Sequence, residues 1–190
     1  MTRLSTERLD ELYLGTLRLV ARDGFDKITM DQIAEATHSS KATLYRQWGS
    51  KAGLVATALN CVTATPDDPP DTGSLRGDLI GMLAGRHQAL EQEADLVGSI
   101  LHAVKTDATL RTALRDQIIS TLHGRLAAVV ERAVDRGEVA TANPALRHID
   151  LVLIAPFVLR LLIDDRPVDD DYLIDYLDAV LLPALGVVPR

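Results

Sequence analysis

The chain has 190 residues, of which 47% are apolar and 4% aromatic, and its formal net charge is −7 at pH 7. This length supports one or two domains with their own core, and the composition is typical of a soluble globular protein, not of a membrane protein. The single cysteine, Cys61, excludes an internal disulfide framework and a cysteine-based metal cluster. Its apolar neighbours predict a buried thiol.

The charge is divided unevenly along the chain. Residues 1–51 carry eight Lys and Arg against seven Asp and Glu, whereas residues 52–190 carry twelve against twenty. No acidic residue lies between Glu35 and Asp67, although this window contains three Lys and Arg. A basic window inside an acidic chain predicts a local site for an anionic partner, although a merely solvated basic surface has the same signature.

The first predicted helix begins near Ser5 and ends at Gly24, a residue that suits the position after a helix. Its apolar positions recur at spacings of three and four, which places them on one side of the helix. They are Leu9, Leu12, Tyr13, Thr16, Leu17 and Val20. We expect this stripe to be buried.

The second predicted helix has a complete start signal. Thr29 and Gln32 have the spacing of a capping box, and Ile28 and Ile33 have the spacing of the hydrophobic staple that accompanies it. Capping of this kind stabilises a helix by about 1 kcal/mol, so the start is well defined. We expect the helix to end near residues 37–38.

Two short elements follow. Either Ser39 or Ser40 can cap a third helix, which runs through Leu44 to Trp48. A glycine then interrupts it, and Ser50 caps a fourth helix. Leu44 and Trp48 are four positions apart and share one face, which we expect to pack against the first two helices.

The remainder of the chain also predicts helices. Residues 66–73 read PDDPPDTG and form the clearest linker. Further helices are expected at 75–90, 94–105, 109–136, 143–163 and 169–185. The sequence shows no credible strand and no internal repeat, so we expect an all-α protein of about nine helices.

The stretch from the second to the fourth predicted helix carries the functional signal. A short capped helix, a tight turn and a second short helix with polar residues fit the major groove of DNA. We expect the following residues to contact DNA: Thr29, Ser39, Ser40, Lys41, Ala42, Thr43, Tyr45, Arg46, Gln47 and Lys51. Each of these polar side chains, taken singly, is also compatible with ordinary solvation.

Individual roles follow from the chemistry of the side chains. Thr29 and Tyr45 suit phosphate oxygens, and Lys51 in a first helical turn opposes the helix dipole unless a phosphate faces it. Gln47 can pair with the edge of adenine, and Arg46 or Lys41 with guanine. Ala42 allows close approach of the backbone.

At these positions the sequence resembles the TetR family of bacterial regulators. The resemblance covers roughly the first 55 positions and rests on Ala21, Gly24, Phe25, Thr29, Ile33, Ala34, Ala36, Ser40 to Tyr45, Trp48, Ser50 and Lys51. It implies a homodimer with one helix-turn-helix in each subunit and a helical C-terminal domain that binds a small molecule. The resemblance accordingly divides the chain into a DNA-binding domain, residues 1–51, and a regulatory domain, residues 52–190.

Three residues depart from the family pattern. His38 replaces a common glycine in the turn, and histidine tolerates the left-handed conformation better than most residues. Ser39 replaces an apolar residue and can add a phosphate contact, and Trp48 replaces the usual Phe. The DNA-binding assignment survives these changes.

The C-terminal part resembles the family in architecture alone. In the family, the last two helices of one subunit pair with those of another. We therefore expect the dimer interface of this chain to include Leu151, Ile154, Val158, Leu161, Leu162, Tyr172, Tyr176 and Val180. The resemblance also implies an inducer pocket among the fourth to eighth helices, and the candidate ligand-binding residues there are Leu59, Val62, Met82, Leu83, Val97, Leu101, His102, Leu122, Leu126 and Phe157. Each of these is also compatible with plain core or surface packing.

The function expected is that of a repressor that binds a palindromic operator in double-stranded DNA as a homodimer and is released by a small apolar effector. The alternative is a DNA-binding regulator that needs no effector or responds to a protein partner. The five histidines form no zinc-type pattern, and nucleophile-elbow, P-loop and dinucleotide motifs are missing from the sequence. We therefore expect no enzymatic activity, no cofactor and no metal, and a cytoplasmic location without membrane attachment.

Overall fold

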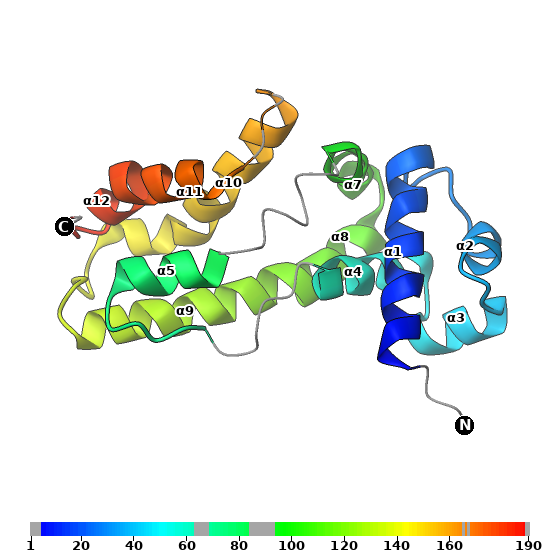
Figure 1. Cartoon of the computed structure of the whole chain (residues 1–190), viewed down its shortest axis with the longest axis horizontal. Coiled ribbons are helices and arrows are strands. Elements are labelled where there is room, and N and C mark those ends of the chain that lie inside the picture. The colour runs from blue at the N-terminus through cyan, green and yellow to red at the C-terminus, as the bar shows by residue number, and fades with distance from the viewer. Residues whose placement is uncertain (1–4, 63–68, 84–93, 165, 167, 189–190) are drawn as a thin grey trace. The chain divides into compact units, whose positions relative to one another are not determined.

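The computed structural model describes residues 5–62, 69–83, 94–164, 166 and 168–188. Within these residues all regular secondary structure is helical, in nine uninterrupted stretches, and the chain divides into two compact units (Figure 1). This confirms the predicted fold class. None of the described helices is long and apolar enough to cross a membrane.

The first unit combines the N-terminal helices with a later segment of the chain. Its elements are α1 (Thr6–Asp23), α2 (Met30–Ala36), α3 (Lys41–Trp48), α4 (Lys51–Val62), α7 (Ala94–Thr106), α8 (Ala108–Leu114) and the π-helical turn η1 (Arg115–Ile119). In Figure 1, α2 and α3 lie together on one side of α1. The unit is therefore discontinuous in sequence.

Helix α1 begins and ends where the sequence predicts. The side chain of Ser5 accepts a hydrogen bond from the amide of Arg8 at 3.3 Å, which caps the N-terminus. Gly24 has φ +87°, and its N–H donates to the carbonyl of Val20 at 3.0 Å. A side chain at this φ would be strained, so glycine suits the position.

The core of the first unit is built around α1, α4 and α7. Leu12 and Leu17 of α1 and Leu54 of α4 are fully or almost fully buried there, and Leu96 and Ile100 of α7 join the same cluster. The helix-turn-helix thus packs on a core to which α7 contributes. A functional boundary at residue 51 stays a prediction, because packing alone does not separate the two functions.

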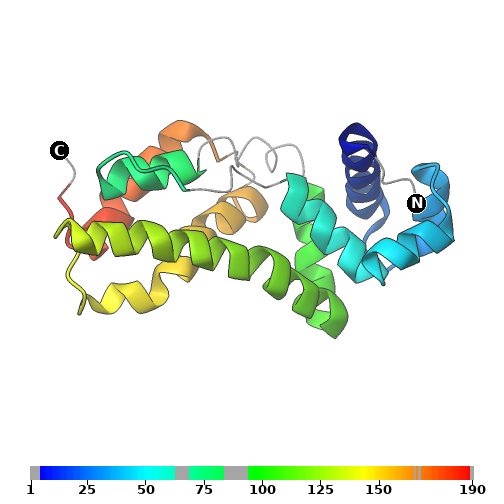
Figure 2. The same cartoon turned by 90° about the horizontal axis from the view of Figure 1, so that it is seen from below.

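The second unit contains the rest of the described chain. Its elements are α5 (Leu75–Leu83), α9 (Ser120–Asp135), the 3₁₀ helix η2 (Pro144–His148), α10 (Ile149–Leu162), α11 (Asp170–Tyr176), the π-helical turn η3 (Leu177–Leu181) and α12 (Leu182–Ala184). Figure 2 shows α9 from the side, with η2 and α10 running back along it. Apolar residues of α5, α9, α10, α11 and η3 meet in one core.

Several predicted elements differ in detail. The helix expected at 75–90 is seen to Leu83, and positions 84–90 lie outside the described residues. The helix expected from Asn143 starts as a 3₁₀ turn, with the Asn143 side chain capping at Ala145 N, and becomes α-helical at Ile149. The expectation of a buried Cys61 is wrong, because Cys61 is exposed at the end of α4, beyond the stripe that the helix buries.

Candidate nucleic-acid interface

The start of α2 has the predicted capping box. The amide of Gln32 donates to Thr29 Oγ1 at 3.3 Å, and the amide of Thr29 donates to Gln32 Oε1 at 2.8 Å. The hydroxyl of Thr29 also donates to Gln32 Oε1 at 3.0 Å. Ile28 and Ile33 are buried on either side of the cap. The hydroxyl proposed for a phosphate is therefore already engaged in holding the helix start.

The turn between α2 and α3 is left-handed at His38, where φ is +48°. His38 is the one non-glycine with positive φ among the described residues, which agrees with its place where the family commonly has glycine. The amide of Ser39 then donates to the carbonyl of Ala34 at 2.8 Å and closes the turn. The turn is thus left-handed without a glycine.

A residue that sequence reasoning missed stabilises this turn from outside. The guanidinium of Arg8 in α1 donates to the carbonyl oxygens of Thr37 and His38, the latter at 3.2 Å, and forms an ion pair with Glu11 at 2.8 Å. These are carbonyls at the end of α2, which lack helical partners. Arg8 and the turn are about thirty positions apart, so no local sequence signal indicates the contact.

Helix α3 is capped and anchored as the sequence predicts. Of the two candidate serines, Ser40 is the cap: its Oγ accepts from the amide of Thr43 at 3.1 Å. Leu44 is fully buried, and Trp48 packs edge-on against Tyr13 with ring centroids 5.9 Å apart. The packing of Leu44 and Trp48 therefore determines which side of α3 faces solvent.

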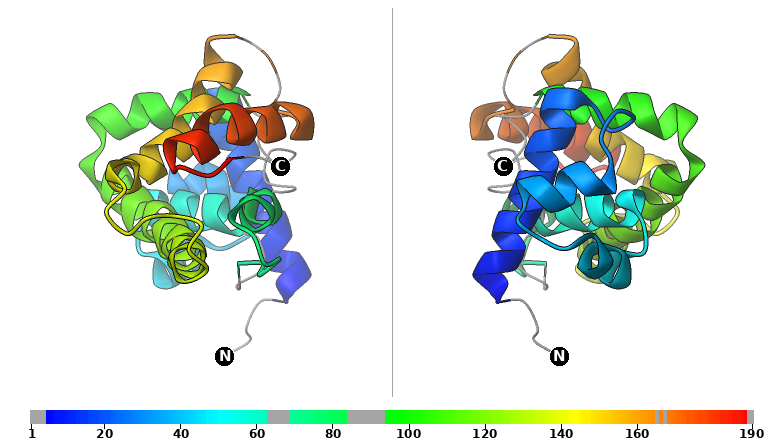
Figure 3. Two further views of the ribbon diagram at one scale, coloured as in Figure 1. Left: turned by 90° about the vertical axis from the view of Figure 1, so that its left-hand side faces the viewer. Right: turned by 90° about the vertical axis from the view of Figure 1, so that its right-hand side faces the viewer.

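The opposite side of α3 is open to solvent. Lys41, Ala42, Tyr45, Arg46 and Gln47 are exposed, and Tyr45 keeps 46% of its surface accessible. Thr43 and the preceding Ser39 are half-buried, and Ser40 is exposed. The right-hand view of Figure 3 looks onto the part of the first unit that carries α2 and α3. Nine of the ten predicted DNA contacts, all but Lys51, thus lie in α3, in the turn before it or at the start of α2.

Lys41 has an acidic neighbour on this surface. Its Nζ lies 2.8 Å from the carboxylate of Asp31 in the first turn of α2. The hydrogen bond to Asp31 and its negative charge raise the pKa of Lys41 above the ordinary value. The cation remains charged at neutral pH, and it is presented together with a carboxylate.

Lys51 is placed differently from the expectation that suggested a phosphate contact. Its Nζ donates to the carbonyl oxygens of Phe25 at 2.6 Å and of Ile28 at 2.9 Å, and it lies 4.2 Å from the centroid of the Phe25 ring. Burial lowers the pKa of this amine. These carbonyls explain a cation in the first turn of α4, and a phosphate contact by Lys51 stays a prediction.

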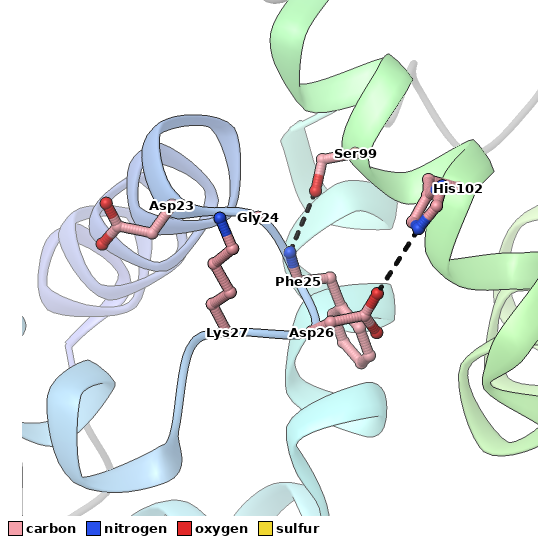
Figure 4. Close-up of a pocket in the computed structure, with 7 residues that line it drawn as sticks. All are labelled: Asp23, Gly24, Phe25, Asp26, Lys27, Ser99 and His102. Carbon is pink, nitrogen blue, oxygen red and sulfur yellow. Dashed lines mark hydrogen bonds and ion pairs between the residues drawn. The ribbon is translucent and has the colours of Figure 1, made fainter.

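The loop held by Lys51 is also attached to α7. The amide of Phe25 donates to Ser99 Oγ at 2.9 Å, and Asp26 lies 3.9 Å from His102 Nε2 (Figure 4). Around these contacts lies an open hollow of about 300 Å³, lined by Asp23, Gly24, Phe25, Asp26, Lys27, Ser99 and His102. No sequence pattern predicts this hollow.

The candidate ligand-binding residues fall into the two units. Leu59, Val62, Val97, Leu101 and His102 belong to the first unit, and Met82, Leu83, Leu122 and Leu126 are buried in the core of the second. Leu101 is exposed at 40%, and of all these residues His102 alone lines the hollow described above. The side chain of Phe157 lies outside the described residues.

The candidate interface residues on α10 to η3 differ in exposure. Leu151 and Val180 are exposed, Leu161 is buried in its own chain, and Ile154, Val158, Leu162, Tyr172 and Tyr176 are half-buried. The two tyrosines stack with centroids 6.4 Å apart, and Arg160 lies 3.8 Å from the ring of Tyr172. Leu159 and Ile163 are exposed as well, although they are not among the predicted interface residues.

Comparison with known proteins places the same features in a family. Residues 12–58 match the family described as bacterial regulatory proteins, tetR family, and residues 69–180 match the tetracyclin repressor-like C-terminal domain. An uncharacterized HTH-type transcriptional regulator of Mycobacterium tuberculosis is 34% identical over 178 residues, which is 94% of this chain and 88% of that protein. A DNA-binding transcriptional repressor TetR of Mycobacteroides abscessus is 37% identical over 170 residues, 87% of each chain.

Solved structures agree with these matches. The crystal structure of a TetR family transcription regulator superposes with a TM-score of 0.65 at 27% identity and covers 96% of this chain and 100% of its own. A further TetR-family structure, from Rhodococcus sp., reaches a TM-score of 0.74 at 17% identity over 95% of this chain and 100% of its own, which supports the fold alone.

Proposed function

This chain belongs to the TetR family of helix-turn-helix transcriptional regulators, and from that premise we propose that it is a cytoplasmic repressor that binds a palindromic operator as a homodimer and is released by a small apolar ligand. The observation that carries the proposal is the solvent-facing side of α3, whose direction is fixed by the buried Leu44. Polar side chains on one side of an anchored recognition helix are the feature that enters the major groove.

The residues divide into two kinds of contact. Tyr45 donates its hydroxyl to a phosphate oxygen and sets the register of α3 on the duplex. Gln47, Arg46 and Lys41 reach base edges, with Gln47 suited to adenine and the two cations suited to guanine. Thr29 and Ser39 lie on the N-terminal side of this helix and add contacts to the phosphates of the DNA backbone.

Dimerisation through α10 and the following helices is supported by an apolar surface. Leu151, Leu159 and Ile163 are 69%, 57% and 75% exposed, respectively. They are eight and four positions apart, so Leu151 and Leu159 lie on the same side of α10, and Ile163 continues this side just after the helix ends. A second copy of the same side would cover them in a two-fold interface. The two recognition helices then meet half-sites about one helical turn, roughly 34–36 Å, apart.

Release by an effector rests on the family and on the apolar core of the second unit. We place an apolar, flexible ligand beside Met82, Leu83, Leu122 and Leu126, which are buried in one cluster. Its binding shifts α4, which follows α3 after two residues, and moves the recognition helices off the half-site spacing. The differential affinity of the ligand for the two states supplies the energy. A regulator that needs no effector would share the DNA contacts and lack this response.

A mobility-shift titration on DNA upstream of the protein's own gene tests the proposal. Wild type is expected to bind a palindrome, and Tyr45→Ala and Lys41→Ala to lose about tenfold in affinity each, since hydrogen bonds to charged groups contribute about 1.5–3 kcal/mol. Arg147→Ala, an exposed cation of the second unit, is the matched control and keeps wild-type affinity. Unchanged binding in both α3 variants, with the fold intact by circular dichroism, would remove α3 as the reading helix.

The effector is tested separately. A ligand that co-purifies with the protein, or an apolar molecule that raises its melting temperature, is added to the operator complex. Loss of operator affinity upon ligand binding supports release. Tight binding of ligand without any change in operator affinity would favour the effector-independent regulator.

A further inference from the structure

An ion pair joins the two helices of the helix-turn-helix at their N-terminal ends. Lys41 is the first residue of α3, and Asp31 lies in the first turn of α2. The ammonium and carboxylate groups are 2.8 Å apart, with side chains 52% and 66% exposed. Both charges therefore reach solvent on the surface that faces DNA.

The charges of these two helices do not form a simple phosphate-binding surface. Between residues 30 and 48 the acids Asp31 and Glu35 balance the cations Lys41 and Arg46. A phosphate bound to the ammonium of Lys41 would come within a few ångströms of the Asp31 carboxylate, and like charges at that distance repel. Lys41 is thus poorly placed to act as a phosphate contact.

A base edge is a better partner for this pair, because it carries donors and acceptors without a full negative charge. The N-terminal residues of a recognition helix are those that contact bases, and Lys41 occupies that position. Guanine presents N7 and O6 as acceptors in the major groove, and cytosine presents the N4 amino group as a donor. Lysine matches the first, and aspartate matches the second.

We propose that Asp31 is a specificity-determining residue, which acts with Lys41 to select one guanine–cytosine base pair in each half-site. Guanine O6 and cytosine N4 lie side by side on the edge of that pair, as the ammonium and the carboxylate do here. In an adenine–thymine pair the thymine methyl group adjoins its acceptor and meets a charged side chain poorly. The proposal rests on the DNA-binding function of α3 and adds a residue of α2 to the base-reading set.

The exposure of both partners makes the proposal testable without loss of the fold. Exposed ion pairs contribute little to stability, so Asp31→Ala is expected to fold as wild type does. Glu35→Ala is the matched control, because Glu35 is an exposed acid one turn further along the same helix. Both variants remove one negative charge, whereas Asp31→Ala alone removes the acceptor beside Lys41.

The experiment is a selection of binding sites from randomised duplex DNA by the full-length wild type and both variants, followed by titrations. We expect wild type to select a guanine–cytosine pair in each half-site and to lose about tenfold in affinity when it is replaced by adenine–thymine. Glu35→Ala is expected to keep that ratio, although it binds all DNA somewhat more tightly. Asp31→Ala is expected to lower that ratio to about threefold, because the acceptor for cytosine is lost while Lys41 still contacts guanine.

Two results would overturn the proposal. One is an Asp31→Ala variant that binds every sequence more tightly, as Glu35→Ala does, while retaining the wild-type base preferences, since the carboxylate would then act only as a repelling charge. The other is a wild-type motif without such a base pair. Failure of wild type to select any motif would instead refute sequence-specific operator binding itself.

Discussion

The ammonium nitrogen of Lys51 lies 2.6 Å from the carbonyl oxygen of Phe25 and 4.2 Å from the centroid of its ring. The amide of Phe25 donates to the hydroxyl of Ser99 in α7. The loop between α1 and α2 is therefore attached to α4 through its carbonyls and to α7 through an N–H. Because α4 begins two residues after the end of α3, this loop links α7 to the position of α3 within the first unit.

Lys51→Met is expected to destabilise the protein by about 1–3 kcal/mol, because it leaves partly buried carbonyls without their donor while keeping the apolar stem. Urea unfolding followed by fluorescence of Trp48, the single tryptophan, measures this within the first unit. Lys105→Met, at an exposed site in the last turn of α7, is the control. Wild-type stability combined with weakened operator binding would instead assign Lys51 to a phosphate.

His38→Val is expected to cost about 1–2 kcal/mol, because a β-branched residue at φ +48° is strained, whereas His38→Gly relieves the strain and costs little. Thermal unfolding monitored by the far-ultraviolet circular dichroism signal compares the three proteins. His148→Val is the control, since His148 is exposed and has φ −115°. Equal melting temperatures for the valine and glycine variants at position 38 would contradict a left-handed turn.

The local features of the interface could be predicted from sequence because the interacting atoms are close in the chain. The capping box of Thr29 and Gln32, the Ser40 cap and the burial of Leu44 each depend on residues within four positions of one another. The place of His38 in the family pattern indicates the left-handed turn. These signals were sufficient to orient the exposed side of α3.

The contacts that could not be predicted join distant parts of the chain. Arg8 meets the end of α2 across about thirty positions, and Ser99 meets Phe25 across seventy-four. A cation in the first turn of α4 suggests an external phosphate that offsets the helix dipole, whereas the Phe25 and Ile28 carbonyls supply the negative potential. The π-helical turns η1 and η3 could not be predicted either, because the apolar residues around them have the spacing of a continuous α-helix.

Asp78 of α5 is a fully buried carboxylate in the second unit. It accepts from the amide and hydroxyl of Thr72 at 2.6 and 2.8 Å, and from Arg136 at 3.2 Å. Burial alone would raise the pKa of Asp78, but these donors outweigh it and hold the pKa below the ordinary value. The carboxylate is therefore charged in the folded protein at neutral pH.

Because folding lowers the pKa of Asp78, its carboxylate stabilises the folded protein at pH values above the pKa of the unfolded chain, which is near 4. This stabilisation is lost as the pH falls through the pKa of the folded protein. We expect Asp78→Asn to cost about 3–5 kcal/mol at pH 7 and to flatten the loss of stability between pH 5 and pH 3. Urea unfolding at several pH values measures both effects. Asp175→Asn, at an exposed site of α11, should match wild type, and a wild-type acid profile in Asp78→Asn would refute this role.

Leu151→Glu is expected to weaken the dimer without unfolding the subunit, because Leu151 is 69% exposed in the isolated chain. Burial of a leucine against a partner contributes about 1.5–3 kcal/mol, and two-fold symmetry makes each substitution act twice. Analytical ultracentrifugation should show a shift towards monomer, and operator affinity should fall because the two half-sites are no longer bound together.

Leu14→Glu, at an exposed leucine of α1, is the matched control and should leave the dimer intact. A dimer equally stable in Leu151→Glu and wild type would exclude this side of α10 as the interface, and loss of the dimer in Leu14→Glu would move the interface to the first unit.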